Sequence, residues 1–329
     1  DTEVGGERPT VQLVNVKKTK DGYEFGFDKL DRWIDMCRRC GIKYFEMSHL
    51  FTQWGAEHAP KIVAEVDGEK KRIFGWETDA DSEEYRDFLH RFAAALTAFI
   101  DRKGIRNFCR FHVSDEPSLE QYEVYKKRAD LIAEIFPGFK VIDALSDIEF
   151  FDKDAVKYPI PSEDHVEDFV GKVDEFWTYY CCGQHNKNVP NRFFAMPSAR
   201  NRILGTLLYK YNATGFLQWG YNYWYSQFSK HEIDPFTVTD AGKAFPSGDA
   251  FVVYPGEDGQ PINSLRFKVF YDGLQDLAAM RLLESLVGRE KALEIAIQDD
   301  ELTFQKYPHG SSYLLTLRAR VNKAIKENI

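Results

Sequence analysis

Short apolar runs of strand type alternate with longer segments of helical periodicity along most of the chain, and this alternation limits the possible folds more than any other feature. Helices are expected at 27–41, 81–103, 118–136, 197–211 and 264–287, because apolar side chains recur there every three or four residues. Strands are expected at 10–16, 42–47, 106–112, 140–144, 175–180, 193–195, 215–219 and 250–254. Such alternation is typical of an α/β fold built on a parallel sheet.

The number of strand–helix units predicts how the sheet is arranged. About eight units in fewer than 300 residues predict a (β/α)8 barrel of the TIM type. Residues 60–76 predict an inserted β-hairpin that turns at Asp67-Gly68, and residues 291–299 and 311–328 predict extra C-terminal helices. We find no linker or repeat and expect a single domain over 1–329. A doubly wound open sheet is the alternative, but the glycine-rich nucleotide motifs of that fold follow no predicted strand.

Charge and composition limit the class of partner. The chain has 43 basic and 52 acidic side chains, a net charge of −9, which argues against a nucleic-acid or anionic-membrane surface and fits a neutral ligand better. The sequence contains no run of about eighteen apolar residues, so no transmembrane segment is expected. Aromatic side chains make up 15% of the residues, a density that serves a core but also provides the flat faces on which sugars stack.

The residues best suited to chemistry follow the third predicted strand, in the run FHVSDEP. Functional groups of a barrel lie at the C-terminal ends of its strands, and Asp115 and Glu116 occupy such an end. Pro117 cannot donate to a strand ladder and favours extended backbone at Glu116, so we expect the strand to stop and both carboxylates to turn towards one cavity. The alternative is that Ser114 or Asp115 caps the helix expected from Ser118, although a cap accounts for only one acid.

Two adjacent carboxylates predict a particular kind of glycoside hydrolysis. Carboxylates that share a cleft have their pKa values pushed apart, so that one donates a proton while the other stays charged. The acids of ordinary glycosidases flank the sugar, about 5–5.5 Å or about 6.5–9.5 Å apart, whereas adjacent residues fit substrate-assisted catalysis by the 2-acetamido oxygen of the sugar. We expect Glu116 to be the general acid/base and Asp115 to orient the acetamido group and stabilise an oxazolinium-like intermediate. This chemistry needs no metal ion or other cofactor.

Further candidates follow other predicted strands. The run QWGYNYWY interleaves rings with amides, which suits a hydroxyl-rich ligand, and rings beyond the strand expose area unless something covers them. A lone histidine is more often structural than catalytic, and core packing is an equal alternative for the tyrosine that ends the strand at 175–180. The candidate substrate-binding residues are Glu46, His49, Trp54, His112, Tyr179, Gln218, Trp219, Asn222 and Trp224.

Five ordered runs resemble the catalytic domain of glycoside hydrolase family 123: residues 50–56 (LFTQWGA), 74–78 (FGWET), 111–117 (FHVSDEP), 218–224 (QWGYNYW) and 247–256 (SGDAFVVYPG). The resemblance implies a (β/α)8 barrel of β-N-acetylgalactosaminidases that retain anomeric configuration by substrate assistance. The family's adjacent Asp-Glu pair maps onto Asp115 and Glu116. The resemblance also implies an N-terminal β-sandwich domain missing from this chain, and export to the periplasm or the cell exterior.

The expected substrate is a glycan or glycoconjugate with a terminal 2-acetamido sugar, N-acetylgalactosamine in the first place. Two other functions stay open. One is a two-carboxylate retaining glycosidase in which Glu46 faces Glu116 across the cleft. The other is a non-catalytic barrel that binds carbohydrate through its rings.

Overall fold

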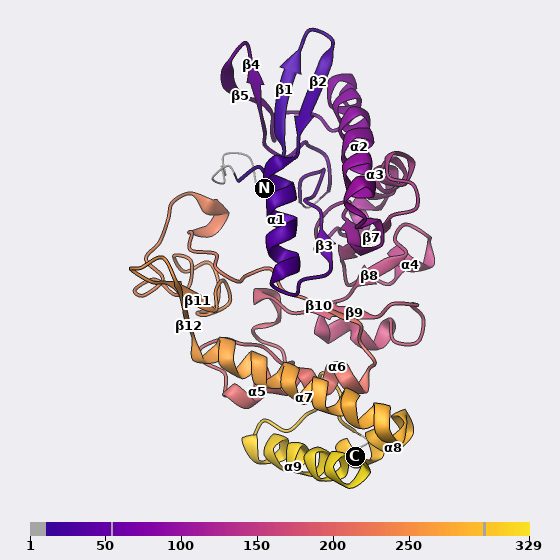
Figure 1. The fold of residues 1–329 in the computed structure, drawn as a ribbon, viewed down its shortest axis with the longest axis vertical. Helices are drawn as coiled ribbons and strands as arrows, with labels where there is room; N and C mark the ends of the chain where they lie inside the picture. The colour runs from indigo at the N-terminus through magenta and orange to yellow at the C-terminus, as the bar shows by residue number, and fades with distance from the viewer. Residues whose placement is uncertain (1–10, 54, 299–300) are drawn as a thin grey trace. The chain divides into compact units, whose positions relative to one another are not determined.

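The computed structural model describes residues 11–53, 55–298 and 301–329, which form two compact units (Figure 1). Unit 1 comprises the described residues up to Pro159 together with Phe228–Lys230. Unit 2 comprises Ile160–Gln227 and the described residues from His231 onward.

Unit 1 combines two sheets with helices. Its elements are β1 (Asn15–Thr19), β2 (Gly22–Gly26), α1 (Asp28–Arg39), β3 (Phe45–Glu46), β4 (Ile62–Val66), β5 (Glu69–Phe74), α2 (Glu83–Lys103), β6 (Cys109–Phe111), α3 (Tyr122–Ile135), β7 (Lys140–Ala144), α4 (Glu149–Asp152) and, continuing into unit 2, β8 (Tyr158–Ile160).

The first sheet of unit 1 has the strand order β2-β1-β4-β5. β1 pairs antiparallel with β2 and parallel with β4, and β4 and β5 form the hairpin predicted at 60–76. The two-residue turn has positive φ at both Asp67 (54°) and Gly68 (83°), as a type I′ turn requires. The hairpin is therefore confirmed, and it belongs to a four-stranded sheet.

Helix α2 packs against this sheet through aromatic rings. Its N-cap is Ser82, whose hydroxyl accepts the backbone N–H of Tyr85, and it ends at Gly104, which has a left-handed φ of 68°. On its apolar face, Phe88 meets the ring of Tyr23 from β2 edge to face, with centroids 5.0 Å apart. The predicted boundaries of this helix follow from these two caps.

The second sheet of unit 1 has the order β3-β6-β7-β8 and precedes the predicted acids. β3 pairs parallel with β6, and β6 pairs parallel with β7. Phe111 on β6 stacks on Phe136 at the end of α3, with ring centroids 4.1 Å apart. Because the carboxyl ends of parallel strands meet at one edge of a sheet, the residues that follow β3, β6 and β7 lie close together.

Unit 2 contains shorter strands and a layer of helices. Its elements are β9 (Trp177–Tyr179), α5 (Ser198–Arg202), α6 (Leu204–Lys210), β10 (Gly215–Leu217), β11 (Val253–Pro255), β12 (Pro261–Asn263), α7 (Leu265–Val287), α8 (Arg289–Ala296) and α9 (Ser311–Asn328). β9 and β10 pair in parallel, whereas β11 and β12 form an antiparallel pair.

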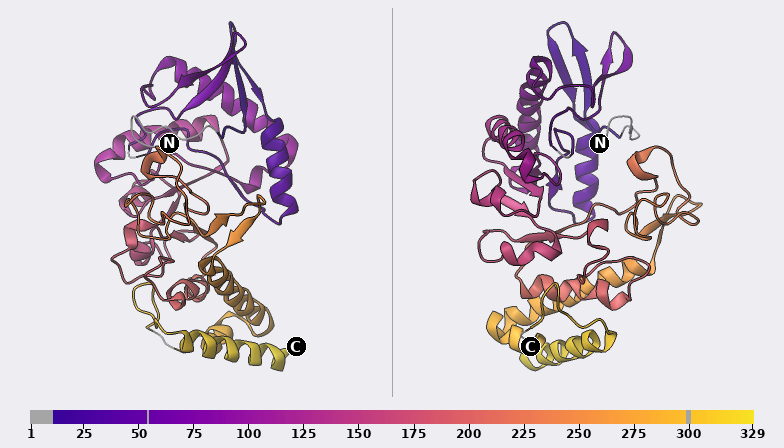
Figure 2. Two further views of the ribbon diagram at one scale, coloured as in Figure 1. Left: turned by 90° about the vertical axis from the view of Figure 1, so that its left-hand side faces the viewer. Right: turned by 180° about the vertical axis from the view of Figure 1, so that it is seen from behind.

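The helices of unit 2 pack closely around α7 (Figure 2). A Cβ atom added to Gly205 of α6 would lie 1.8 Å from the carbonyl oxygen of Gly273 in α7, so the two backbones touch. One turn further along α7, the buried carboxylate of Asp276 pairs with Arg202 at 2.7 Å and with Arg318 of α9 at 2.9 Å. A backbone contact and a shared carboxylate thus join four helices.

The predicted fold class is confirmed as a mixed α/β fold with parallel strands, and both extra C-terminal helices are present as α8 and α9. A closed barrel and a single domain stay predictions, because the described parallel strand pairs lie in three separate sheets. None of the helices within the described residues is long and apolar enough to cross a lipid bilayer.

Four strand predictions differ from the structure. The first part of the strand expected at 106–112 is a 3₁₀ turn, Arg106–Phe108, and the strand itself is Cys109–Phe111. The strand expected at 10–16 lies at Asn15–Thr19, where a tight turn to β2 gives it a local antiparallel partner outside the parallel sheet. No strand forms at 193–195, because the chain turns there with a hydrogen bond of 3.0 Å from Met196 N–H to the Phe193 carbonyl. The strand expected at 250–254 lies at Val253–Pro255 and pairs antiparallel with β12.

Candidate active site

The chain leaves β6 at His112 and places both predicted catalytic acids in the irregular segment that follows. Asp115 is half-buried and Glu116 is exposed. The backbone N–H of Glu116 donates to the carbonyl of Ala144, at the end of β7, at 3.0 Å. Glu116 has a φ of 45°, so the extended backbone predicted before Pro117 is wrong. A non-glycine residue held in such a conformation costs about 1–3 kcal/mol and is typical of functional sites.

The alternative that Ser114 or Asp115 caps the following helix is wrong. Ser118 and Gln121 form a capping box on the 3₁₀ turn that precedes α3, with the Ser118 N–H donating to Gln121 Oε1 at 3.0 Å. Ser114 is occupied elsewhere, since its hydroxyl donates to the carbonyl of Thr52 at 3.0 Å. Neither Ser114 nor Asp115 therefore caps the helix.

A glutamine from the loop after β3 orients Asp115. Gln53 donates from Nε2 to Asp115 Oδ2 at 2.6 Å. The loop is held by the buried side chain of Arg128, whose Nε donates to the carbonyl of Ala56 at 3.0 Å. Trp54, a predicted binding residue in the same loop, lies outside the described residues. The Asp115 carboxylate thus has a fixed direction in the segment beyond β6.

A buried chain of polar side chains connects β7, β6 and β3. Asp143 is fully buried and accepts the backbone N–H of Val113 at 3.1 Å and the hydroxyl of Tyr125. His112 Nδ1 lies 3.2 Å from Asp143 Oδ1, and His112 Nε2 lies 2.8 Å from Glu46 Oε1. The second contact is a close ion pair rather than a linear hydrogen bond. This series of polar side chains ends at Glu46, whose side chain is 48% exposed.

The charge states of these polar side chains follow from burial and pairing. Burial acts to lower the pKa of His112, but the carboxylates of Asp143 and Glu46 outweigh it and raise this pKa to about 10. Burial acts to raise the pKa of Glu46, and the contact with His112 reverses this and lowers it, an effect that water weakens at a half-exposed side chain. Burial and the charge on His112 lower the pKa of His49 to about 4 against the attraction of Asp115 and Glu46. At neutral pH the site therefore holds a charged His112 beside a neutral His49.

The same cluster has the spacing of a metal site. Within the described ranges, His49, His112 and Asp143 place potential ligand atoms within 4.8 Å of one another. A charged imidazole has no lone pair for a metal, and the Asp143 oxygens already face the donors of Val113, Tyr125 and His112. This donor set fits a hydrogen-bonded charge pair better than a metal centre.

In unit 2, a buried arginine fixes the loop that follows β10. Arg192 directs Nη2 at Gln218 Oε1 (2.7 Å), at the carbonyl of Asp249 (2.8 Å) and at the carbonyl of Gly220. The indole Nε1–H of Trp219 donates to Asp249 Oδ2 at 3.0 Å, and the Trp219 side chain stays 40% exposed. Burial raises the pKa of Asp249 to about 6, although the Arg192 charge and the Trp219 hydrogen bond oppose it. The ring of Trp219 therefore has a fixed orientation at the surface of unit 2.

The other predicted residues of unit 2 differ in exposure. Asn222 is exposed. Trp224 is half-buried and donates from Nε1 to the carbonyl of Val253 at 3.1 Å. Tyr179 is only 5% exposed and pairs with Leu217 across the two parallel strands β9 and β10. Of these side chains, that of Asn222 is the most accessible to a ligand.

The predicted residues fall into two groups. Unit 1 holds Glu46, His49, His112, Asp115 and Glu116, and unit 2 holds Tyr179, Gln218, Trp219, Asn222 and Trp224. Sequence reasoning missed Tyr125, Asp143, Arg192 and Asp249. A signal existed for Asp143, which interrupts the apolar run of β7, and for Asp249, which lies within the conspicuous run at 247–256.

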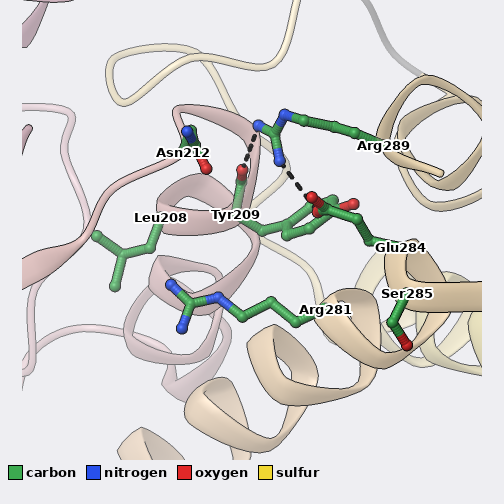
Figure 3. Close-up of a pocket in the computed structure, with 7 residues that line it drawn as sticks. All are labelled: Leu208, Tyr209, Asn212, Arg281, Glu284, Ser285 and Arg289. Carbon is green, nitrogen blue, oxygen red and sulfur yellow. Dashed lines mark hydrogen bonds and ion pairs between the residues drawn. The ribbon is translucent and has the colours of Figure 1, made fainter.

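A separate depression of about 340 Å³ lies among the helices of unit 2 (Figure 3). Arg281 and Glu284 of α7 and Arg289 of α8 line it. Arg289 donates to the carbonyls of Tyr209 and Lys210, at the end of α6, and pairs with Glu284 at 3.2 Å. Because Arg289 serves a helix terminus and no predicted site residue lines the depression, we do not assign the active site to it.

Comparisons with known proteins identify the family of this chain. Residues 1–283 match the protein family described as the catalytic domain of glycoside hydrolase 123. A solved family 123 glycoside hydrolase from Clostridium perfringens, studied for the details of glycolipid glycan hydrolysis, has a TM-score of 0.66 and 16% identity, covering 96% of this chain and 57% of that chain. A family 5 mannosidase from Rhizomucor miehei has a TM-score of 0.38 and 10% identity, covering 80% of this chain and 77% of that one. No curated protein matches.

The chain thus spans little more than half the length of the Clostridium perfringens enzyme, with which it shares the fold. The family match extends over residues 1–283 of 329 and includes all the predicted site residues. The chain therefore belongs to glycoside hydrolase family 123.

Proposed function

We propose that this glycoside hydrolase releases a terminal β-linked N-acetylhexosamine, N-acetylgalactosamine in the first place, by substrate-assisted catalysis with retention. The supporting observation is that Asp115 and Glu116 follow β6 as neighbours, while Ser118 and Gln121 supply the helix cap. Two adjacent acids that cap no helix, one of them at a positive φ, are better explained by chemistry than by stability.

In the proposed reaction, Glu116 donates its proton to the glycosidic oxygen while the acetamido oxygen attacks the anomeric carbon. The bond to the leaving group breaks, and the sugar becomes an oxazolinium-like ring. Asp115, oriented by Gln53, accepts the acetamido N–H and stabilises the positive charge. Water then attacks the anomeric carbon and gives a proton to Glu116, while the bond from this carbon to the acetamido oxygen breaks. The acetamido group is regenerated, and the original configuration is restored.

The proposed substrate is a glycan with a neutral terminal sugar. The ring of Trp219 in unit 2 is proposed as a stacking surface for a sugar, because Asp249 holds its indole while the residue stays 40% exposed. The net charge of −9 does not favour a polyanionic ligand. The neighbour from Clostridium perfringens was studied on glycolipid glycans, so glycolipid glycans with a terminal N-acetylhexosamine are the first natural substrates to test.

The test is hydrolysis of aryl β-N-acetylgalactosaminides by the wild type and by Glu116→Gln. We expect the variant to lose about 10²- to 10⁴-fold in kcat on a poor leaving group and to recover on a dinitrophenyl leaving group, which departs without protonation. Glu120→Gln is the matched control, since Glu120 is an exposed acid of the same segment. A wild-type chain that is inert on every 2-acetamido glycoside would contradict the proposal.

The two-carboxylate mechanism is a second candidate, because His112 keeps Glu46 ionised, as a nucleophile requires. A thiazoline mimic of the cyclised intermediate decides between the two, since it should inhibit only the substrate-assisted enzyme. A carbohydrate-binding chain without catalysis would instead bind saccharides unaffected by Asp115→Asn and show no turnover.

A further inference from the structure

We propose that Glu46 binds hydroxyl groups of the substrate sugar, and that His112 and Asp143 are positioning residues that fix its carboxylate for this purpose. The assignment rests on the proposed function and names a specificity determinant of the same site. It is carried by the polar chain that starts in the interior of unit 1 and ends at an accessible carboxylate.

The position of Glu46 relates it to the candidate catalytic acids. Glu46 is the last residue of β3 and pairs with Arg110 of β6, the strand that precedes Asp115. The two strands run parallel, so Glu46 and Asp115 leave the sheet at the same edge. Gln53, from the loop after β3, already contacts Asp115 at 2.6 Å. A sugar bound by Asp115 therefore lies near the end of β3.

The buried carboxylate of Asp143 fixes the direction of the His112 ring. Both oxygens of Asp143 are oriented by the Val113 N–H and the Tyr125 hydroxyl, and Asp143 in turn faces His112 Nδ1 at 3.2 Å. The opposite nitrogen, Nε2, then lies 2.8 Å from Glu46. Removing these charges from water is unfavourable, and apolar side chains would fill the space equally well. The network is therefore better explained by the carboxylate it holds than by core stability.

The chemistry of the held carboxylate suits a sugar. An ionised carboxylate only accepts hydrogen bonds, and it accepts them strongly from hydroxyl groups. Close to a charged imidazole it has no proton to donate, so it does not compete with Glu116 as an acid. A site that is built to bind a hydroxyl discriminates strongly against an analogue that lacks it. Glu46 is thus suited to distinguishing sugars by their hydroxyl groups.

The experiment combines variants with deoxy substrates. Glu46→Gln is assayed on aryl β-N-acetylgalactosaminide, on its 4-epimer and on its 3-, 4- and 6-deoxy analogues. We expect kcat/KM to fall about 10- to 100-fold on the parent sugar, but only about twofold on the analogue without the bound hydroxyl. Equal losses on all substrates, or a loss of kcat as large as that of Glu116→Gln, would overturn the proposal in favour of a nucleophilic Glu46.

The positioning role needs its own variants. His112→Gln and Asp143→Asn should reproduce the hydroxyl-dependent loss of Glu46→Gln, mainly in KM, and should add little to it in the double variants. His90→Gln is the matched control, because His90 forms an exposed pair with Glu134 at 4.0 Å. Folded variants with losses that do not depend on the hydroxyl groups would overturn the positioning role. If the buried variants fail to fold, Glu46→Gln on the deoxy series still decides whether Glu46 binds a hydroxyl.

The outcome of the Glu46 experiments can be separated from the outcome of the test of the proposed function. If the wild type hydrolyses 2-acetamido glycosides, the proposed function holds whatever the deoxy series shows. If it hydrolyses only glycosides without an acetamido group, the proposed function fails, and the Glu46 experiment is repeated on deoxy analogues of that glycoside. A wild type that neither hydrolyses nor binds any of these sugars overturns both.

Discussion

Replacing Arg192 with methionine tests whether a buried guanidinium fixes the loop that carries Trp219. Methionine has a similar length but donates no hydrogen bond. The variant removes the donor shared by Gln218 Oε1 and by two buried backbone carbonyls, those of Gly220 and Asp249. It also removes the positive charge that offsets the buried Asp249 carboxylate.

The expected cost follows from these contacts. A buried acceptor left without its donor costs about 1–3 kcal/mol, and breaking a buried charge arrangement by removing one partner costs about 3–5 kcal/mol. Since the contacts share one nitrogen and are not additive, we expect a total of about 3–5 kcal/mol. With an unfolding entropy of about 2.1 cal/mol/K per residue, a chain of 329 residues would lose about 4–7 °C in Tm.

The assay is thermal and urea denaturation of the variant, combined with saccharide titration. The control is Lys323→Met, which also loses one positive charge but from an exposed pair with Glu327 at 3.8 Å, worth less than about 1 kcal/mol. We expect the Arg192 variant to be clearly less stable than the control and to bind saccharide more weakly, because Trp219 loses its fixed orientation. Equal stability of the two variants would refute the assigned role of Arg192.

Three further predictions concern pH, helix packing and backbone strain. The pKa of His112 is raised to about 10 from 6.5, so its contribution to stability is complete below about pH 6.5 and is lost as pH rises through about 10. The free energy of unfolding should therefore fall more steeply over this range in the wild type than in His112→Gln, and parallel curves would contradict the pairing. Gly205→Ala should cost about 3 kcal/mol or more in urea denaturation, because its Cβ would lie 1.8 Å from the Gly273 carbonyl oxygen. The control Gly183→Ala, which meets only a sulfur at 3.5 Å, should cost far less. Glu116→Gly should raise the unfolding free energy by about 1 kcal/mol while abolishing hydrolysis, since glycine adopts a φ of 45° without strain; a loss of stability would argue against strain at this residue.

The parts of the fold that depend on local sequence were predictable. The Asp67-Gly68 turn, the caps of α2 at Ser82 and Gly104, and the α9 boundaries all follow from residues within a few positions of the feature. The pairing of β1 was not predictable in the same way. Its apolar run suited a barrel strand, but β2, which begins after a turn of two residues, provides a partner at a smaller loss of chain entropy.

In the candidate site, too, features set by local sequence were predictable and features set by distant partners were not. That Asp115 and Glu116 lie at the end of a strand was predictable from their position before Pro117, and the structure places them there. The positive φ of Glu116 was not, because it depends on a hydrogen bond to Ala144, on another strand. Asp143 and Arg192 escaped notice for a related reason, since their partners are 18 to 57 residues distant in sequence.

The capping box of Ser118 and Gln121 has a consequence for reading relatives of this chain. Because the helix start is secured downstream of the two acids, amino-acid changes at the acid positions do not remove the helix cap. Relatives without these two carboxylates would keep the same helix start. Shared architecture is thus uninformative about turnover, and under the proposed function the identity of these two side chains would distinguish active from inactive relatives.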